Sequence, residues 1–276
     1  MFVNLESFVI QSMQKQSQYL GDDAAVVEKC LYSQDAFFEN IHFKREWLSA
    51  YEIGAKAMLV NLSDAIAMNA KPKFALVTLA FPKSTLKKDL SELMRGLHET
   101  AASFGCEIIG GDTIANTKID LSITIISEGS AILERKGAKE GDLLAYTGTL
   151  GSVGKDLRYL LSGGKPRKNS KFTRPILRVK FIEKARPLLH GGMDISDGLL
   201  EDSKKLTKTI NRSFFYDKNL SRMQKCSGEE YEMLVSFPAR NLKALMRIAK
   251  ATRTPLTVFG IIAKNKPVRV CKANHF

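Results

Sequence analysis

Apolar residues recur with two different periods along the first half of the chain. Several short segments are rich in valine, isoleucine, leucine and phenylalanine and are bounded by glycine, proline or charged residues, which predicts β-strands. The predicted strands are 24–32, 33–38, 74–81, 106–111 and 118–129. Between them, 49–69 and 84–104 carry apolar residues at helical spacing and predict two α-helices. Alternating strands and helices indicate an α/β domain.

A second alternating block follows a stretch of glycines and charged residues at 137–142. A strand predicted at 143–148 opens this block, which continues to about Lys272. We therefore predict an α/β (α+β) protein of two domains, 1–136 and 137–276, with mixed sheets and flanking helices. The chain of 276 residues is 44% apolar, which is enough for a sizeable core.

The chain contains no apolar run of about eighteen residues, and its first segment alternates apolar and polar positions without a basic stretch followed by an apolar block. We expect neither a signal peptide nor a membrane anchor, and hence a cytoplasmic protein. The four cysteines are far apart and have no histidine at metal-ligand spacing. We therefore expect neither a zinc site nor a structural disulfide.

The net charge of +13 is typical of proteins that bind polyanions. However, the basic residues are dispersed over most of the chain, and aromatic residues do not alternate with them as base-stacking platforms would. We expect a solvated basic surface, with no nucleic acid and no membrane as partner.

Four acidic motifs carry the candidate chemistry, because each lies at the end of an apolar run beside glycine, serine or asparagine. The motifs are GDDAAV at 21–26, NLSDAIAMNAKP at 61–72, GGDT at 110–113 and MDISDGL at 193–199. A buried carboxylate is costly unless it is paired or binds a cation, and few arginines flank these motifs. Oxygen ligands without histidine or cysteine favour magnesium or calcium.

Each motif also has a simpler interpretation. Asp64 could be an ordinary polar position on a helix, although the turn around it is otherwise apolar. Asp112 alone is more typical of a turn, and Asp194 or Ser196 could cap a helix, which is compatible with metal binding. The paired aspartates of the first motif could form a simple turn. The four motifs together favour a site for several magnesium ions bridged by phosphates.

A glycine-rich segment at 147–157 has the wrong spacing for a P-loop. Gly148 lies too far before Gly154, and Asp156 stands where a serine or threonine should follow Lys155. We interpret this segment as a strand-to-helix turn that opens the second domain. A phosphate near its backbone amides is a secondary alternative.

Seven motifs occur in the order found in thiamine-monophosphate kinases: GDDAAV, SQDAFFENIHF, IGAKAMLVNLSDAIAMNAKP, GGDT, GAKEGDLLAYTGTLG, MDISDGL and SGEEYEM. From about residue 20 to 237 the chain resembles that family, which belongs to the ATP-binding superfamily that includes aminoimidazole ribonucleotide synthetase. The resemblance implies that superfamily's two-domain fold and a homodimer built by the N-terminal sheets. It also implies transfer of the γ-phosphate of ATP to thiamine monophosphate with magnesium, which gives thiamine diphosphate.

The resemblance also assigns roles to individual residues. It implies metal ligation by Asp23, Ser33, Gln34, Asp35, Asp64, Asp112, Asp194 and Asp197. It places Gly111, Asp112, Arg135 and Ser196 against ATP, and His42 and Glu229 against thiamine monophosphate. From the residues alone, His42 is more typical of a structural histidine, and Arg135 is one basic residue among 42. No Ser-His-Asp or Cys-His arrangement occurs, so we expect metal-assisted transfer without a covalent nucleophile.

The chain departs from the family pattern at three places. Gln34 replaces a usual threonine, Asn40 and Ile41 replace a glycine-asparagine pair, and Ala273 stands where an aromatic residue often contacts the acceptor. Two relatives in the superfamily remain as alternatives, a selenophosphate synthetase and a hydrogenase-maturation carbamoyl dehydratase. Both are disfavoured, because they carry a reactive cysteine near the N-terminus or at the C-terminus, and this chain has neither. A basic nucleic-acid-binding protein is the alternative from another functional class.

Overall fold

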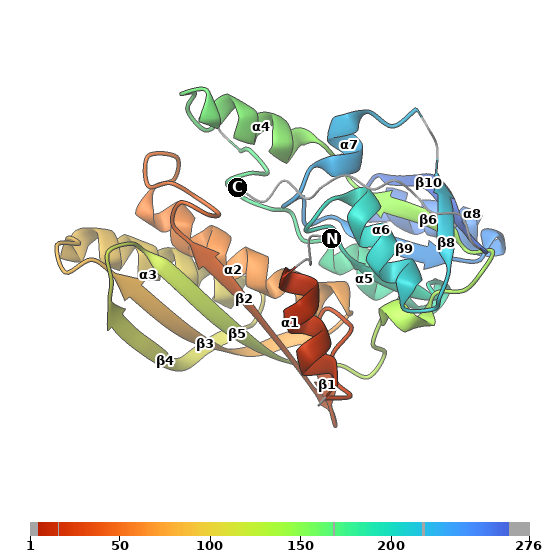
Figure 1. Cartoon of the computed structure of the whole chain (residues 1–276), viewed down its shortest axis with the longest axis horizontal. Helices are drawn as coiled ribbons and strands as arrows, with labels where there is room; N and C mark the ends of the chain where they lie inside the picture. Colours follow the sequence, from red (N-terminus) through yellow and green to blue (C-terminus); the bar gives the residue numbers. More distant parts are fainter. Residues whose placement is uncertain (1–4, 16, 168, 217–218, 265–276) are drawn as a thin grey trace.

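Two five-stranded sheets form the framework of the computed structural model, and helices pack against both (Figure 1). The structure describes residues 5–15, 17–167, 169–216 and 219–264. The first sheet has the order β1-β2-β5-β3-β4 and is mixed, because β3 and β4 pair in parallel. The second has the order β7-β9-β6-β10-β8, and its described pairs are all antiparallel. The expected class of two sheets with flanking helices is confirmed.

The elements of the first half follow the predicted order. The strands are β1 (Ala25–Val27), β2 (Cys30–Phe38), β3 (Lys71–Phe81), β4 (Glu107–Ala115) and β5 (Asp120–Glu128). The helices are α1 (Leu5–Gln14), α2 (Ala50–Ala67) and α3 (Lys87–Ser103).

The strand break predicted between 32 and 33 is wrong. The chain instead turns between β1 and β2, where Glu28 adopts a left-handed φ of 56°. This turn contains none of the glycine or asparagine that normally marks one, so the sequence gives no signal for it. The strand predicted at 106–111 also continues to Ala115, which places Asp112 inside a strand and rules out the turn interpretation.

The second half contains five strands and several short helices. The strands are β6 (Leu143–Thr147), β7 (Gly191–Asp194), β8 (Ser213–Tyr216), β9 (Met233–Phe237) and β10 (Leu256–Ala263). The α-helices are α4 (Ser152–Leu161), α5 (Val179–Ala185), α6 (Leu199–Lys208), α7 (Arg222–Cys226) and α8 (Leu242–Ala251). The 3-10 turns are η1 (Arg135–Gly137), η2 (Arg186–Leu188) and η3 (Ala239–Asn241). The two sheets fall on either side of 129–142, while the exact domain boundary at 136/137 stays a prediction.

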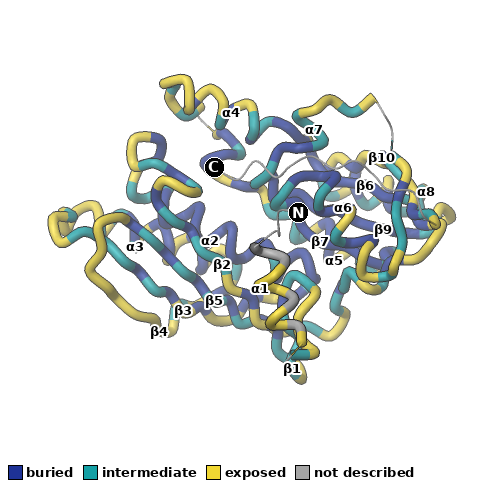
Figure 2. The backbone as a smooth tube through the Cα atoms, in the orientation of Figure 1, coloured by how far each residue is buried: buried dark blue, intermediate teal, exposed yellow. Residues whose placement is uncertain are grey.

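Helix α2 lies between the two halves of the molecule and is buried over most of its length (Figure 2). Ser49 caps it, because its hydroxyl accepts from the Glu52 N–H while the Glu52 carboxylate accepts from the Ser49 N–H. On one side α2 contacts β2 and β5, and on the other it contacts β7 and α5. A methyl group at Gly54 would lie 2.1 Å from the Leu93 carbonyl oxygen, so α2 and α3 pack backbone to backbone.

The two faces of the first sheet differ in burial. The inner face, toward α2, carries Ala75, Val77, Leu121, Ile123 and Ile125, all buried. The opposite face, here called the outer face, exposes Tyr32, Phe74, Leu76 and Ile114. Strand β4 at the sheet edge is exposed along most of its length (Figure 2). A row of exposed apolar side chains on a sheet is typical of a surface that another chain covers.

No described helix combines the length and apolar character required to cross a bilayer. Cys226 is disulfide-bonded, so the expectation of no disulfide is wrong, whereas Cys30 and Cys106 are free thiols. Cysteine spacing in the sequence does not reveal which residues the fold brings together.

Candidate active site

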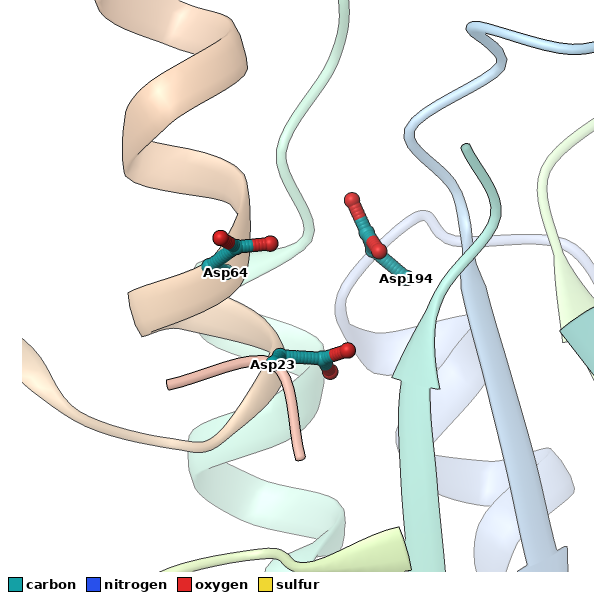
Figure 3. Close-up of side chains that lie close together, drawn as sticks. All are labelled: Asp23, Asp64 and Asp194. Atoms are coloured by element: carbon teal, nitrogen blue, oxygen red, sulfur yellow. The ribbon is translucent and has the colours of Figure 1, made fainter. Parts of the chain in front are cut away.

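Three aspartates from distant segments converge between the two halves of the molecule (Figure 3). Asp23 precedes β1, Asp64 lies near the end of α2, and Asp194 ends β7. One carboxylate oxygen of each lies within 4.8 Å of the others. The acidic motifs predicted to share a site therefore meet, except for the one that contains Asp112.

Local contacts hold these carboxylates in place. The Ser63 hydroxyl, one residue before Asp64 on α2, donates to Asp194 Oδ2 at 2.7 Å. The Arg135 guanidinium, from η1, donates to Asp23 through Nε at 3.1 Å and through a second, shorter contact from Nη2. The backbone N–H of Arg135 also donates to Asp22 Oδ2 at 2.9 Å. The family resemblance implies that Arg135 lies against ATP, and in this structure its guanidinium pairs with the Asp23 carboxylate.

The cluster carries more negative charge than its surroundings neutralise. Burial, and then the neighbouring aspartates, raises the pKa of Asp64 and of Asp194 well above the ordinary value. Burial and the charge of Asp23 raise the pKa of Asp22 and of Asp35 to about 6. Each of these shifts means that the ionised form lacks a sufficient cationic partner.

The donor set fits a hard divalent cation. All the groups are carboxylate oxygens, which magnesium and calcium prefer. Asp23 Oδ2 is buried and has no hydrogen-bond partner among the described residues, although an unpartnered buried carboxylate oxygen is costly. A cation between Asp23, Asp64 and Asp194 would satisfy this oxygen and offset the repulsion.

A second acidic pair adjoins the cluster, with Asp197 in the turn between β7 and α6 and Asp202 in the first turn of α6. Lys205, from α6, makes a short ion pair with Asp197 Oδ2, and its Nζ lies 3.4 Å from Asp202 Oδ1. The sequence predicted Asp197 as a ligand but missed Lys205, since nothing distinguishes it from the other basic residues before the fold is known.

A cavity of about 330 Å³ lies beside the acidic cluster. Its walls come from α4, α7, the β7–α6 turn and the loop before β9. Apolar side chains such as Leu157, Phe172 and Met223 line it together with the predicted site residues Ser196, Asp197 and Glu229. The structure therefore brings residues assigned to metal, ATP and acceptor around one space.

Lys56 forms part of the support behind this cavity. Its fully buried ammonium donates to Glu229 Oε2 at 2.7 Å and lies 4.0 Å from the centroid of the Phe172 ring. Because Lys56 lies on α2, this ion pair joins the two halves of the molecule. A lysine among the apolar residues in the middle of α2 was the available sequence signal, and it was missed.

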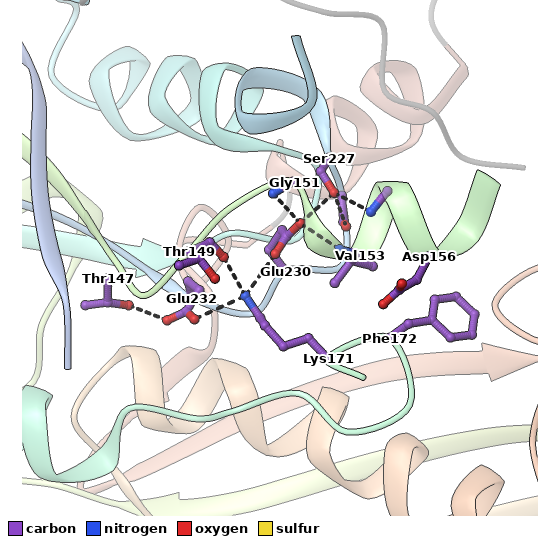
Figure 4. A network of polar contacts seen from close by, with 12 residues as sticks. Thr147, Thr149, Gly151, Val153, Asp156, Lys171, Phe172, Ser227, Glu230 and Glu232 are labelled. Carbon is purple, nitrogen blue, oxygen red and sulfur yellow. Dashed lines mark hydrogen bonds and ion pairs between the residues drawn. The ribbon is translucent and has the colours of Figure 1, made fainter. Parts of the chain in front are cut away.

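Buried ion pairs also fix the turn that opens α4 (Figure 4). Glu230 Oε1 accepts from the N–H groups of Gly151 and Val153 at 2.7 and 3.2 Å. Lys171 Nζ lies 2.9 Å from Glu230 and 3.1 Å from Glu232, and both carboxylates are fully buried. The amides at this turn are thus occupied by Glu230, which leaves them unsuited to the phosphate considered from the sequence.

Other predicted site residues lie farther from the cluster. The pairing of the strands places Gln34 and Asp112 on the outer face, opposite to α2. The Gln34 amide bonds to Ser122 and Thr124 at 3.0 and 2.9 Å. Gly111 adjoins Asp112 in β4, which is separated from β2 by two strands. Within one chain, these residues do not join the site.

Ser33 and His42 lie on the α2 side. Ser33 is buried on β2, one residue before Gln34. His42 Nδ1 accepts from the Phe38 N–H at 2.9 Å, and the imidazole stacks on Phe37 with 5.6 Å between ring centroids. Lys56 Nζ lies 5.5 Å from the Phe37 ring, so a chain of contacts through Phe37 and Lys56 links His42 to Glu229 at the cavity wall.

Comparisons with known proteins agree with this architecture. Residues 21–129 match the family model of AIR synthase related protein, N-terminal domain. The thiamine-monophosphate kinase of Aquifex aeolicus (strain VF5) is 29% identical over 95% of this chain and 94% of its own length. That of Buchnera aphidicola subsp. Schizaphis graminum (strain Sg) is 30% identical over 88% of this chain and 84% of its own length. The structure of AaThiL complexed with AMPPCP and TMP has a TM-score of 0.84 at 24% identity, and the match covers 96% of this chain and 92% of that one.

Proposed function

The chain belongs to the thiamine-monophosphate kinase family, and from this premise we propose that it transfers the γ-phosphoryl group of ATP to thiamine monophosphate. The observation that carries the proposal is the convergence of Asp23, Asp64 and Asp194 beside a cavity large enough for a small organic acceptor. Phosphoryl transfer between two phosphate esters needs charge neutralisation and in-line positioning more than a protein nucleophile.

Several carboxylates would hold magnesium at this site. Asp23, Asp64 and Asp194 form the centre, Asp35 extends it along β2, and Asp197 extends it toward the cavity. When bound, magnesium neutralises the phosphate oxygens and orients them for transfer. The chain itself keeps the carboxylates fixed, through Ser63 on Asp194 and Arg135 on Asp23.

The cavity supplies a binding place for the acceptor. Its apolar walls suit a flat heteroaromatic ring, and Glu229 gives one wall a carboxylate that can face a cationic thiazolium. The phosphate of thiamine monophosphate would then point toward Asp197 and the aspartate cluster. ATP would approach from the same cluster, with Ser196 and Arg135 close by.

We also propose that the active molecule is a homodimer that pairs through the first sheet. The exposed apolar residues of the outer face support this arrangement, as does the exposed edge strand β4. Asp112 and Gly111 lie on that strand, away from their own aspartate cluster. In a dimer of this kind they would contribute to the site of the partner subunit.

The acceptor's own phosphate gives the primary test of function. If the carboxylates hold magnesium between ATP and a phosphorylated acceptor, unphosphorylated thiamine leaves that arrangement incomplete and the attacking oxygen unplaced. Such loss of positioning costs several orders of magnitude in rate. With ATP and magnesium, we expect thiamine monophosphate to be converted to thiamine diphosphate and free thiamine to remain unchanged, as measured by chromatography of the products. Comparable phosphorylation of free thiamine contradicts the proposed acceptor.

Subunit complementation tests the dimeric site. D64N and D112N should each be inactive as homodimers. If Asp112 acts in the site of the partner subunit, a mixed dimer has one intact site, and unfolding and refolding an equimolar mixture should restore about a quarter of the wild-type activity. No recovery, with dimers present, places both aspartates in the same chain's site.

A further inference from the structure

Lys205 occupies a position between two carboxylates at the edge of the candidate site. Its ammonium contacts Asp197 Oδ2 and lies 3.4 Å from Asp202 Oδ1, and its side chain is 35% exposed. The neighbouring Lys204 is 53% exposed and pairs instead with Glu201 at 3.6 Å. Adjacent lysines on α6 therefore differ, because one faces the aspartates and the other faces solvent.

Asp202 provides a second place for the Lys205 ammonium. Asp202 is fully buried, and its Oδ2 accepts from the N–H groups of Asp197 and Gly198 at 3.0 Å each. Its Oδ1 accepts no hydrogen bond from the described residues. The ammonium can therefore leave Asp197 for Asp202 Oδ1 while Asp202 continues to hold the backbone of the turn.

The charge of Lys205 also reaches the central cluster. Lys205 interacts favourably with Asp23, and it repels Arg135, the cation paired with Asp23. The carboxylates around this site outnumber these two cations: Asp22, Asp23, Asp35, Asp64, Asp194, Asp197 and Asp202. Lys205 thus neutralises part of the net negative charge of these carboxylates.

We propose that the Lys205 ammonium occupies, beside the Asp197 carboxylate, the place that a divalent cation takes when it binds. Lys205 thereby sets the affinity of the site for that cation. The inference rests on the proposed function for the role of Asp197 as a ligand. Binding of the divalent cation shifts the ammonium to Asp202, so two cations exchange at one carboxylate. Lys205 is in this sense a positioning residue, which holds the Asp197 carboxylate through its ion pair before the metal binds.

The direction of the expected change in metal affinity distinguishes this role of Lys205 from a purely structural one. Like charges repel, so an ammonium within a few ångströms weakens the binding of a divalent cation to the same carboxylates. Removal of the Lys205 charge should therefore tighten metal binding, by about threefold or more. A substitution that only damages the fold weakens metal binding instead.

The test is a titration of the full-length, nucleotide-free protein with Mn²⁺, in which the free ion is followed by electron paramagnetic resonance. The variants are K205M, K205R, and the matched control K204M, which removes a charge from the solvent-facing side of the same helix. We expect tighter binding for K205M, and wild-type binding within about twofold for K205R and K204M. K205Q serves as a second neutral variant if K205M does not fold.

Equal or weaker Mn²⁺ binding by the neutral Lys205 variants overturns the proposal, and so does equal tightening by K204M. The D197N background supplies a further check, because K205M should change Mn²⁺ affinity much less once the shared carboxylate is neutral. The titration contains neither ATP nor thiamine monophosphate, so its outcome does not depend on the reaction. Tighter binding by K205M in a protein without kinase activity would retain this inference and refute the proposed function.

Discussion

Neutralising Asp64 should stabilise the metal-free protein while abolishing phosphoryl transfer. Asp64 lies with Asp23 and Asp194 in a group whose ligand oxygens are within 4.8 Å of one another, and burial together with these neighbours raises its pKa. The substitution D64N keeps the size of the side chain and removes one of the repelling charges. Transfer is lost because the amide is a poor substitute for a magnesium-binding carboxylate.

The size of the effect follows from the distances. Two unit charges 4.8 Å apart repel by about 3.5 kcal/mol at an effective dielectric constant of about 20. The carboxyls relieve part of this repulsion by binding protons, and Arg135 offsets another part. We therefore expect D64N to raise the free energy of unfolding by about 2 kcal/mol at pH 7.5 without metal, which corresponds to a rise of about 4–8 °C in Tm.

The pH dependence of this effect has a definite sign. Asp35 has its pKa raised from 3.8 to about 6 in the folded state, so the folded protein binds more protons than the unfolded chain between these values. The free energy of unfolding of the metal-free protein therefore falls as pH rises from about 4 to above 6. The advantage of D64N should be largest at pH 7.5 and should shrink toward pH 4.5, where the remaining carboxyls are protonated.

Differential scanning calorimetry in EDTA and in magnesium measures the effect directly. Magnesium should raise the Tm of the wild-type protein more than that of D64N. The control is D89N, which neutralises an exposed aspartate in the first turn of α3 and should change Tm only slightly. A lower or unchanged Tm for D64N in EDTA, or near-normal transfer at ordinary magnesium concentration, refutes the electrostatic reasoning.

Two further substitutions test the support around the site. K56M leaves the Glu229 carboxylate without its buried partner and should destabilise the protein by about 3 kcal/mol in urea unfolding. The control K44M, at a half-exposed lysine near the Trp47 ring, should cost less than about 1 kcal/mol. Equal losses would contradict a special role for the buried ion pair. I114K places a charge on the outer face of the first sheet and should yield a folded monomer, as measured by light scattering. The control I114V should remain dimeric. A wild-type protein that is monomeric at micromolar concentration would contradict the proposed assembly.

The sequence was sufficient for those parts of the site that depend on local pattern. The helix around Asp64 and the strand that ends at Asp194 both follow from apolar spacing, and acidic residues at the ends of such elements are a strong indication of a shared site. The alternation of β2 also implied that Gln34 faces away from Asp35, although the family assignment placed both at the metal.

The remaining features depend on contacts between residues far apart in the chain. Lys56 meets Glu229 across 173 positions, and no local pattern encodes that distance. The face on which Asp112 lies depends on the pairing of β3 with β4, where the register shifts between Ala75 and Leu76. A shift of one residue reverses the direction of every later side chain, so strand prediction alone could not place Asp112.

Helix α2 fixes the distance between the cavity wall and the aspartate cluster. Lys56 pairs with Glu229 at the wall of the cavity and Asp64 belongs to the aspartate cluster, and their separation of eight residues corresponds to about 12 Å along a helix. The spacing from the cavity wall to the aspartate cluster is therefore set by the rise per residue within a single helix. One inserted residue between these positions would turn Asp64 by about 100° around the helix axis and advance it by about 1.5 Å. A change in the length of this segment would therefore alter both the distance and the direction from the cavity wall to the aspartate cluster, whereas substitutions at other positions of the helix would leave both unchanged.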